Sequence, residues 1–147
     1  MGLRDTLMTL LGKIDKNTMI QEKALDAAWL RNEVISHNLA NVDTPEYKRK
    51  DVEFEKYLRY ALSAGHDDAI FRMRHNFRFT SPPTLDSVRA GVIREYETTS
   101  MRIDGNNVDI DNEMALLAKN TIKYNVVTQN INGKFNKIKH AITEGRR

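Results

Sequence analysis

The chain of 147 residues contains no cysteine, only three prolines and one tryptophan, and no long hydrophobic run. The absence of cysteine excludes a disulfide framework and thiolate metal sites. No segment approaches the roughly 20 apolar residues of a membrane-spanning helix. Aromatic residues make up 7% of the chain and hydrophobic residues 40%, so any core is thin and mostly aliphatic. The length is that of one domain or one elongated subunit.

The N-terminus also lacks the pattern of a secretory signal. Its apolar patch, MGLRDTLMTLLGKID, is broken by Arg4 and Asp5 and is followed by no small-residue cleavage site. We therefore expect no cleaved signal peptide.

Charge of one sign is scarce as well, because 23 basic and 20 acidic residues leave a net charge of +3. The excess lies in residues 109–147, where basic side chains complement the C-terminal dipole of a helix. The run Lys48, Arg49 and Lys50 is followed by acidic residues that cancel its field. We expect a solvated, self-complementary charged surface there and no nucleic-acid partner.

Catalytic signatures are missing too. The four histidines show no metal-ligand spacing, and no nucleophile elbow or phosphate loop is present. The stretch DGNNVDID at 104–111 resembles a calcium loop only superficially, because an EF-hand alignment on Gly105 places Ser100 and Arg102 at ligand positions. It predicts a turn followed by an Asp N-cap. We expect no catalytic residues, no metal and no cofactor.

Two regions repeat apolar residues with a seven-residue spacing, which predicts an amphipathic helix in each. In residues 1–42 the repeat is interrupted by polar side chains, along the rows Ile14, Gln21, Ala28, Ile35, Val42 and Thr18, Leu25, Asn32, Leu39. In residues 109–147 it is unbroken, and its members are Ile110, Met114, Leu117, Thr121, Tyr124, Thr128, Ile131, Phe135, Ile138 and Ile142. Asp109 or Asp111 can cap the start of this second helix, and Gly145 suits its end.

A rise of 1.5 Å per residue makes these helices about 42 and 50 Å long, so they can pack as an antiparallel, coiled-coil-like pair. Their apolar stripes are narrow, and polar positions such as Asn32 weaken an isolated pair. We expect the helices to gain more by packing against copies in other chains, where a neighbour can satisfy each polar position. A three- or four-helix bundle would need more helix than the intervening sequence indicates.

The central residues, 43–108, lack this repeat. The sequence predicts a polar loop at 63–69 and an extended stretch around the double proline at 80–84. Residues 91–101 are rich in β-branched and aromatic side chains and predict a strand, as one arm of a hairpin. The overall prediction is a mainly α protein whose small β or irregular centre can be partly disordered in isolation.

The stretch NLANVDTPEYKRK at 38–50 predicts a helix end followed by a defined change of direction. Asn38 and Asn41 bracket the helix end, where asparagine adopts the left-handed conformation more readily than any residue except glycine. Asp43 can bond forward to the backbone, and Pro45 fixes the first corner of a turn while holding Thr44 extended. The corner thus fixes the direction of the chain that follows it.

This corner resembles the N-terminal motif of flagellar axial proteins, whose usual form is Asn-x-Ala-Asn-x-x-Thr-Pro-Gly-Tyr. With FRFTSPP and DGNNVDIDNEMALLAKNTIKYNVVTQNINGKFNKIKHAI, the similarity to flagellar rod subunits covers most of the chain. The short length favours a proximal-rod subunit, because hook and distal-rod proteins carry larger central domains. The matched positions are Asn38, Ala40, Asn41, Thr44, Pro45 and Tyr47, with Leu39 and Asp43 inside the motif.

Glu46 departs from the motif, which usually has glycine at this position. A turn with positive φ there would cost Glu46 about 1–2 kcal/mol, whereas a type I turn would avoid that cost.

The resemblance implies a non-enzymatic subunit of the rod that crosses the periplasm and transmits motor torque. It implies export by the flagellar type III apparatus without a cleaved signal, and terminal helices that pack into a tubular core with neighbouring subunits. The implied partners are copies of itself, other rod subunits, membrane-ring and rod-adapter proteins and the export apparatus, with no small-molecule substrate. The alternatives are a sibling rod subunit of FlgC type and a helical nucleic-acid-binding module, whose affinity would fall steeply with salt.

Overall fold

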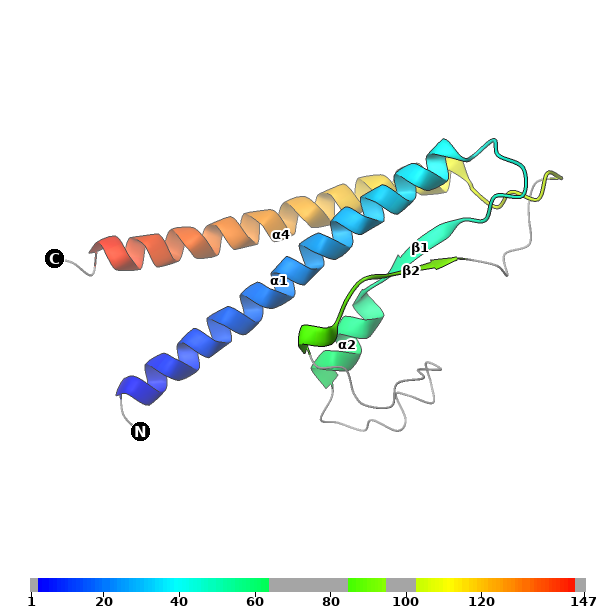
Figure 1. The fold of residues 1–147 in the computed structure, drawn as a ribbon. Coiled ribbons are helices and arrows are strands. Elements are labelled where there is room, and N and C mark those ends of the chain that lie inside the picture. The colour runs from blue at the N-terminus through cyan, green and yellow to red at the C-terminus, as the bar shows by residue number, and fades with distance from the viewer. Residues whose placement is uncertain (1–2, 64–84, 95–102, 145–147) are drawn as a thin grey trace.

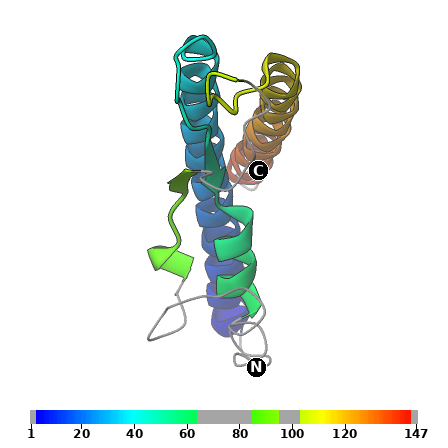
Figure 2. The same ribbon diagram turned by 90° about the vertical axis from the view of Figure 1, so that its right-hand side faces the viewer.

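The computed structural model describes residues 3–63, 85–94 and 103–144. Two long helices run antiparallel, lie close together near the end of the first, and diverge towards the two termini (Figures 1 and 2). The elements are α1 (Leu3–Ala40), β1 (Lys50–Glu53), α2 (Glu55–Ser63), the 3₁₀ helix η1 (Leu85–Ser87), β2 (Gly91–Arg94) and α4 (Ile110–Glu144). The predicted mainly α fold with paired terminal helices is confirmed. None of the described helices is long and apolar enough to span a membrane.

The small sheet joins segments from both sides of the central region. β1 and β2 are antiparallel, with Lys50 opposite Arg94 and Glu53 opposite Gly91. The strand predicted at 91–101 is therefore present over its first four residues, and the remainder lies outside the described residues. Its antiparallel partner is β1, the strand that directly follows the corner, and α2 lies between the two strands in the sequence.

Helix α2 was not predicted from the sequence, and it extends the sheet side of the molecule along α1 (Figure 2). Its first turn begins with Glu55, an acidic residue that suits a helix N-terminus. The predicted polar loop beyond Ser63 and the extended stretch at 80–84 lie outside the described residues.

A small apolar cluster fixes this side of the molecule to α1. Ala27 of α1, Phe54 and Val88 are all buried, and Ala24 on the preceding turn of α1 packs against them. Two alanines leave room for the Phe54 ring to approach the helix backbone. Burial of that ring contributes on the order of 2 kcal/mol.

Polar side chains join α1 to α4. Asn120 Nδ2 donates to the Ala28 carbonyl oxygen at 2.8 Å and to Asn32 Oδ1 at 2.7 Å. Further along, Lys134 Nζ donates to Gln21 Oε1 at 2.6 Å. The expectation that polar heptad positions wait for a neighbouring chain is thus wrong for Asn32 and Gln21, because α4 of the same chain supplies their partners.

Candidate assembly site

The corner is organised around the side chain of Asn38, which is fully buried in the last turn of α1. Its Nδ2 donates to the Lys50 carbonyl oxygen at 2.8 Å and to Glu113 Oε2 at 3.0 Å. Its Oδ1 accepts from the Lys50 amide at 3.0 Å and from the Tyr47 hydroxyl at 3.3 Å. All four hydrogen-bonding positions of the amide are occupied. Asn38 therefore fixes the start of β1 against the end of α1.

Glu113, in the first turn of α4, is the buried acid of this site. Its side chain is fully buried, and Oε1 accepts from Arg49 Nε at 2.6 Å while Oε2 accepts from Asn38. Arg49 is itself almost completely buried. The expected solvated surface at 48–50 is therefore wrong for Arg49, because its charge is neutralised inside the corner. Because breaking a buried ion pair is costly, this pair favours the one arrangement of the corner and α4 in which Arg49 and Glu113 meet.

The turn at Pro45 has the hydrogen bond of a β-turn, from the Tyr47 amide to the Thr44 carbonyl oxygen at 3.4 Å. Pro45 occupies the second position, and Glu46 at the third has a φ of +60°. This is the pattern of a type II turn, in which glycine is favoured at the third position. The positive-φ alternative is thus the one adopted. Glu46 is also the only described non-glycine residue with positive φ, so the left-handed conformation expected at Asn38 or Asn41 is wrong.

Helix α1 ends instead through tighter hydrogen bonds and a side-chain cap. The amides of Asn41 and Val42 donate to carbonyl oxygens three residues earlier. Asn41 Nδ2 donates to the His37 carbonyl oxygen at 2.8 Å, which satisfies one of the unpaired carbonyls at the helix end.

The stretch at 104–111 clamps this turn from the other side. Asn106 is fully buried, and its Nδ2 lies within 2.9 Å of the carbonyl oxygens of Asn41, Val42 and Thr44. Its Oδ1 accepts from the Val108 amide at 2.8 Å. Three carbonyl groups of the corner backbone are therefore held by one side chain.

Neighbouring residues complete the clamp. The Glu46 amide donates to the Asp104 carbonyl oxygen at 2.9 Å, and Lys48 Nζ donates to that of Gly105 at 2.7 Å. The Asn107 Oδ1 accepts from the Arg49 amide at 2.6 Å. Asp109 Oδ1 accepts from the Asp111 amide at 3.0 Å and caps α4, as predicted. The superficially calcium-like sequence thus serves to lock the corner to the start of α4.

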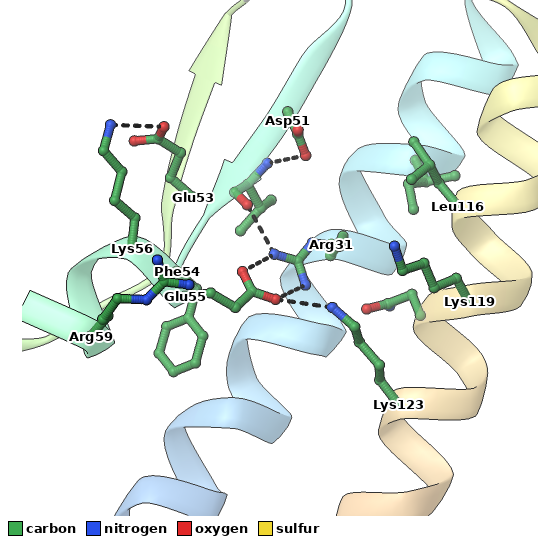
Figure 3. Close-up of a pocket in the computed structure, with 13 residues that line it drawn as sticks. Arg31, Asp51, Glu53, Phe54, Glu55, Lys56, Arg59, Leu116, Lys119 and Lys123 are labelled. Carbon is green, nitrogen blue, oxygen red and sulfur yellow. Dashed lines mark hydrogen bonds and ion pairs between the residues drawn. The ribbon is translucent and has the colours of Figure 1, made fainter. Parts of the chain in front are cut away.

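A second charged connection lies between α1, α2 and α4, beside a groove of about 400 Å³ (Figure 3). Arg31 makes two hydrogen bonds to the Glu55 carboxylate, at 3.1 and 2.7 Å, and also donates to the Val52 carbonyl oxygen. Lys123 of α4 reaches the same carboxylate at 3.1 Å. Partial burial alone would raise the pKa of Glu55, but these partners and its own backbone amide lower that pKa to about 2.

The motif residues divide into buried and exposed groups. Asn38 is buried, whereas Leu39, Asn41 and Tyr47 are half-buried. The remaining members lie on the surface of the corner, and they are Ala40, Asp43, Thr44 and Pro45. The structure brings the whole motif together with three residues that sequence reasoning did not select, Arg49, Asn106 and Glu113. Only the DGNN stretch before the second helix gave a sign of Asn106.

The predicted packing stripe of α4 is mostly exposed in the single chain. Leu117 and Ile131 are half-buried against the rest of the molecule. Phe135 is 58% exposed and Ile142 is 71% exposed. The other exposed members are Ile110, Met114, Tyr124 and Ile138. Within the described chain, this apolar row therefore lacks a covering element over most of its length.

Comparison with known proteins identifies the relatives of this corner and these helices. The chain is 36% identical over 125 residues to the flagellar basal body rod protein FlgB of Bacillus subtilis, covering 85% of this chain and 92% of the relative. It belongs to the FlgB family. FlgB of Yersinia enterocolitica is 29% identical over 92% of this chain and 100% of the relative, and FlgB of Escherichia coli is 26% identical over 92% and 99%. No protein-family model matches the chain.

The FlgB assignment agrees with the geometry of the site. Its members are named as flagellar basal-body rod proteins, a description consistent with a structural rather than an enzymatic role. The FlgB relatives align over most of this chain, so the similarity includes the corner and at least part of each long helix.

Proposed function

We propose that the chain is a structural subunit of the flagellar basal-body rod that polymerises through α1 and α4. The observation that carries the proposal is the exposed apolar row of α4. Soluble monomers rarely leave so long an apolar surface uncovered, and such surfaces mark interaction sites. Packing of this row against neighbouring copies would remove it from water and close the rod core.

The rigid corner supports the same function. A subunit that transmits torque needs a fixed angle between its helical part and the segment that follows. Asn38, Arg49 and Asn106 supply that rigidity through buried hydrogen bonds. The proposal extends to the partners, which are other rod subunits, membrane-ring and rod-adapter proteins, and the flagellar export apparatus. It also includes export without a cleaved signal peptide and a location in the rod that spans the periplasm.

Electron microscopy of basal bodies from a strain lacking the gene tests the role directly. We expect inner-membrane rings without a rod, non-motile cells, and recovery of both when the gene is restored. Intact rods and normal swimming in that strain would contradict the proposal.

A substitution in the row tests the mechanism. Phe135→Ser removes an exposed aromatic ring from the stripe, and serine has a helix propensity close to that of phenylalanine. We expect rod assembly to be lost. The free energy of unfolding of the isolated chain, measured by urea titration, should stay within about 0.5 kcal/mol of the wild type. Gln129→Ser, an exposed change on another face of α4, is the matched control and should assemble normally.

A further inference from the structure

Two rows of like charge lie on exposed faces of the long helices, and two residues of the basic row, Lys119 and Lys123, stand at the groove between α1, α2 and α4 (Figure 3). On α1 the acidic face consists of Glu22, Asp26 and Glu33, all exposed. At 100° per residue these three positions fall within about 40° of one another around the helix. None of the three has an ion-pair partner among the residues that the structure describes.

The basic face lies on α4 and consists of Lys119, Lys123 and Lys137, also exposed. These positions again fall within about 40° around their helix. Lys123 reaches Glu55 of the same chain, whereas Lys119 and Lys137 have no ion-pair partner in the described part of the chain.

The two faces do not meet within one chain. The surfaces that α1 and α4 turn towards each other are marked by Asn32 with Asn120 and by Gln21 with Lys134. The acidic face lies roughly 100° around α1 from the side that carries Asn32. Opposite charges are therefore presented in different directions, which is the arrangement of a head-to-tail contact between copies.

Repulsion between like charges on each helix also favours binding of an oppositely charged partner. Glu22 and Asp26 are four residues apart on α1, as are Lys119 and Lys123 on α4, and like charges at this spacing destabilise a helix by about 0.2–0.5 kcal/mol per pair.

Gly133 lies on the same side of α4 as the basic face, and a Cβ there would meet nothing within 4 Å. A glycine inside a helix costs about 1 kcal/mol relative to alanine. No contact within the described chain requires it, whereas a second helix backbone could approach closely at this point.

We propose that the acidic face of α1 in one copy binds the basic face of α4 in the next copy. This inference rests on the proposed rod function and adds to it the charged contact that sets which helix meets which. The occupant is a second copy, because one chain carries both halves of the complementary pair. A nucleic acid or anionic lipid on the basic face would leave the acidic face without a role.

Charge reversal tests the contact in a strain that lacks the gene. The acidic-face variant is E22K/D26K/E33K, and the basic-face variant is K119E/K137E, which leaves the Lys123–Glu55 pair in place. We expect either variant alone to reduce the number of assembled rods and swimming at least tenfold. The chain that carries all five changes should restore both, because positions 119 and 137 again meet residues of opposite charge on the neighbouring copy, while Lys123 stays paired with Glu55 of its own chain.

Circular dichroism of the purified variants provides the folding control, and helix content should equal that of the wild type. Normal assembly of either single-face variant would overturn the inference. Failure of the five-change chain to restore assembly, with helix content intact, would overturn it as well. The Phe135→Ser variant separates the two proposals, since loss of assembly there with normal charge variants would contradict only the charged contact.

Discussion

The corner and the outer halves of the two long helices are built on opposite principles. At the corner, polar side chains such as Asn38, Asn106 and Glu113 are fully buried and hydrogen-bonded within the chain. Along α4, apolar side chains such as Phe135 and Ile142 are exposed. The usual distribution, apolar inside and polar outside, is therefore reversed in both regions.

The polar groups of the corner find their partners within one chain, whereas the apolar row of α4 is not covered within the described chain. A buried polar network tolerates few alternative geometries, because each misplaced group loses its partner. An apolar row tolerates many partners and gains stability only when it is covered. The single chain thus fixes its own angle, while the apolar row of α4 is the surface that we propose neighbouring copies cover.

The largest effect is expected from Asn106→Asp, which keeps the shape of the side chain. An oxygen would replace the amide nitrogen that now donates to the carbonyls of Asn41, Val42 and Thr44. We expect a loss of about 3 kcal/mol in the free energy of unfolding, measured by urea titration, because a buried acceptor would face three acceptors. Asn112→Asp makes the same chemical change at an exposed position in the first turn of α4 and should stay within about 0.5 kcal/mol. Equal effects of the two changes would show that the corner is no more rigid than the surface.

Glu113→Gln is expected to have the next largest effect. It removes the buried charged partner of the Arg49 guanidinium, which is 10% exposed and would keep only its longer ion pair with Asp51 at 3.8 Å. We expect a loss of about 3 kcal/mol by urea titration. The paired change Arg49→Met with Glu113→Leu removes both charges and should cost clearly less than the sum of the two single changes. Additive losses would mean that the two groups act independently.

These buried groups also show where sequence reasoning succeeds and where it stops. The period of seven predicted both long helices, because one face of each must be apolar whatever it contacts. It did not predict α2, which spans nine residues and whose acid Glu55 is fixed by Arg31 and Lys123 from distant parts of the chain. Nor did it distinguish the buried Arg49 from the exposed charges around it. Burial of a charge depends on its partner, Glu113, which lies 64 positions away.

The motif at the corner illustrates the same limit. The sequence indicated a turn at Thr44 and Pro45 and a cap at Asp109, since both depend on neighbouring residues. It placed Asn38 at the end of the helix, where it lies, but it did not predict that the side-chain amide of Asn38 pairs with Lys50 in the first strand. Local chemistry was thus predictable, and pairing between distant segments was not.

The ion pairs of Glu55 with Arg31 and Lys123 give a smaller effect on stability, and this effect depends on pH. Its pKa is lowered from 4.5 to about 2, so the carboxylate contributes stability that is fully present above pH 4.5 and is lost as the pH falls towards 2. The side chain is half exposed, and solvent screening limits the contribution to about 1 kcal/mol. Between pH 5 and 2, Glu55→Gln should lose less stability than the wild type. Glu22→Gln, at an exposed position, should follow the wild-type curve, and a Glu55→Gln curve parallel to wild type would contradict the assignment.

The smallest effects are expected at the turn, where two residues with positive φ face each other. Glu46 has a φ of +60°, and a Cβ added to Gly105, at +78°, would lie 3.7 Å from the Glu46 Cα. That distance is an ordinary contact, so the strain at either position is conformational rather than steric. Glu46→Gly, which restores the residue usual in the axial motif, should stabilise the chain by about 1 kcal/mol, and Gly105→Ala should destabilise it by a similar amount. Urea titration measures the free energy of unfolding of each variant. A loss of stability in Glu46→Gly would show that the Glu46 side chain contributes more to the corner than its backbone strain costs.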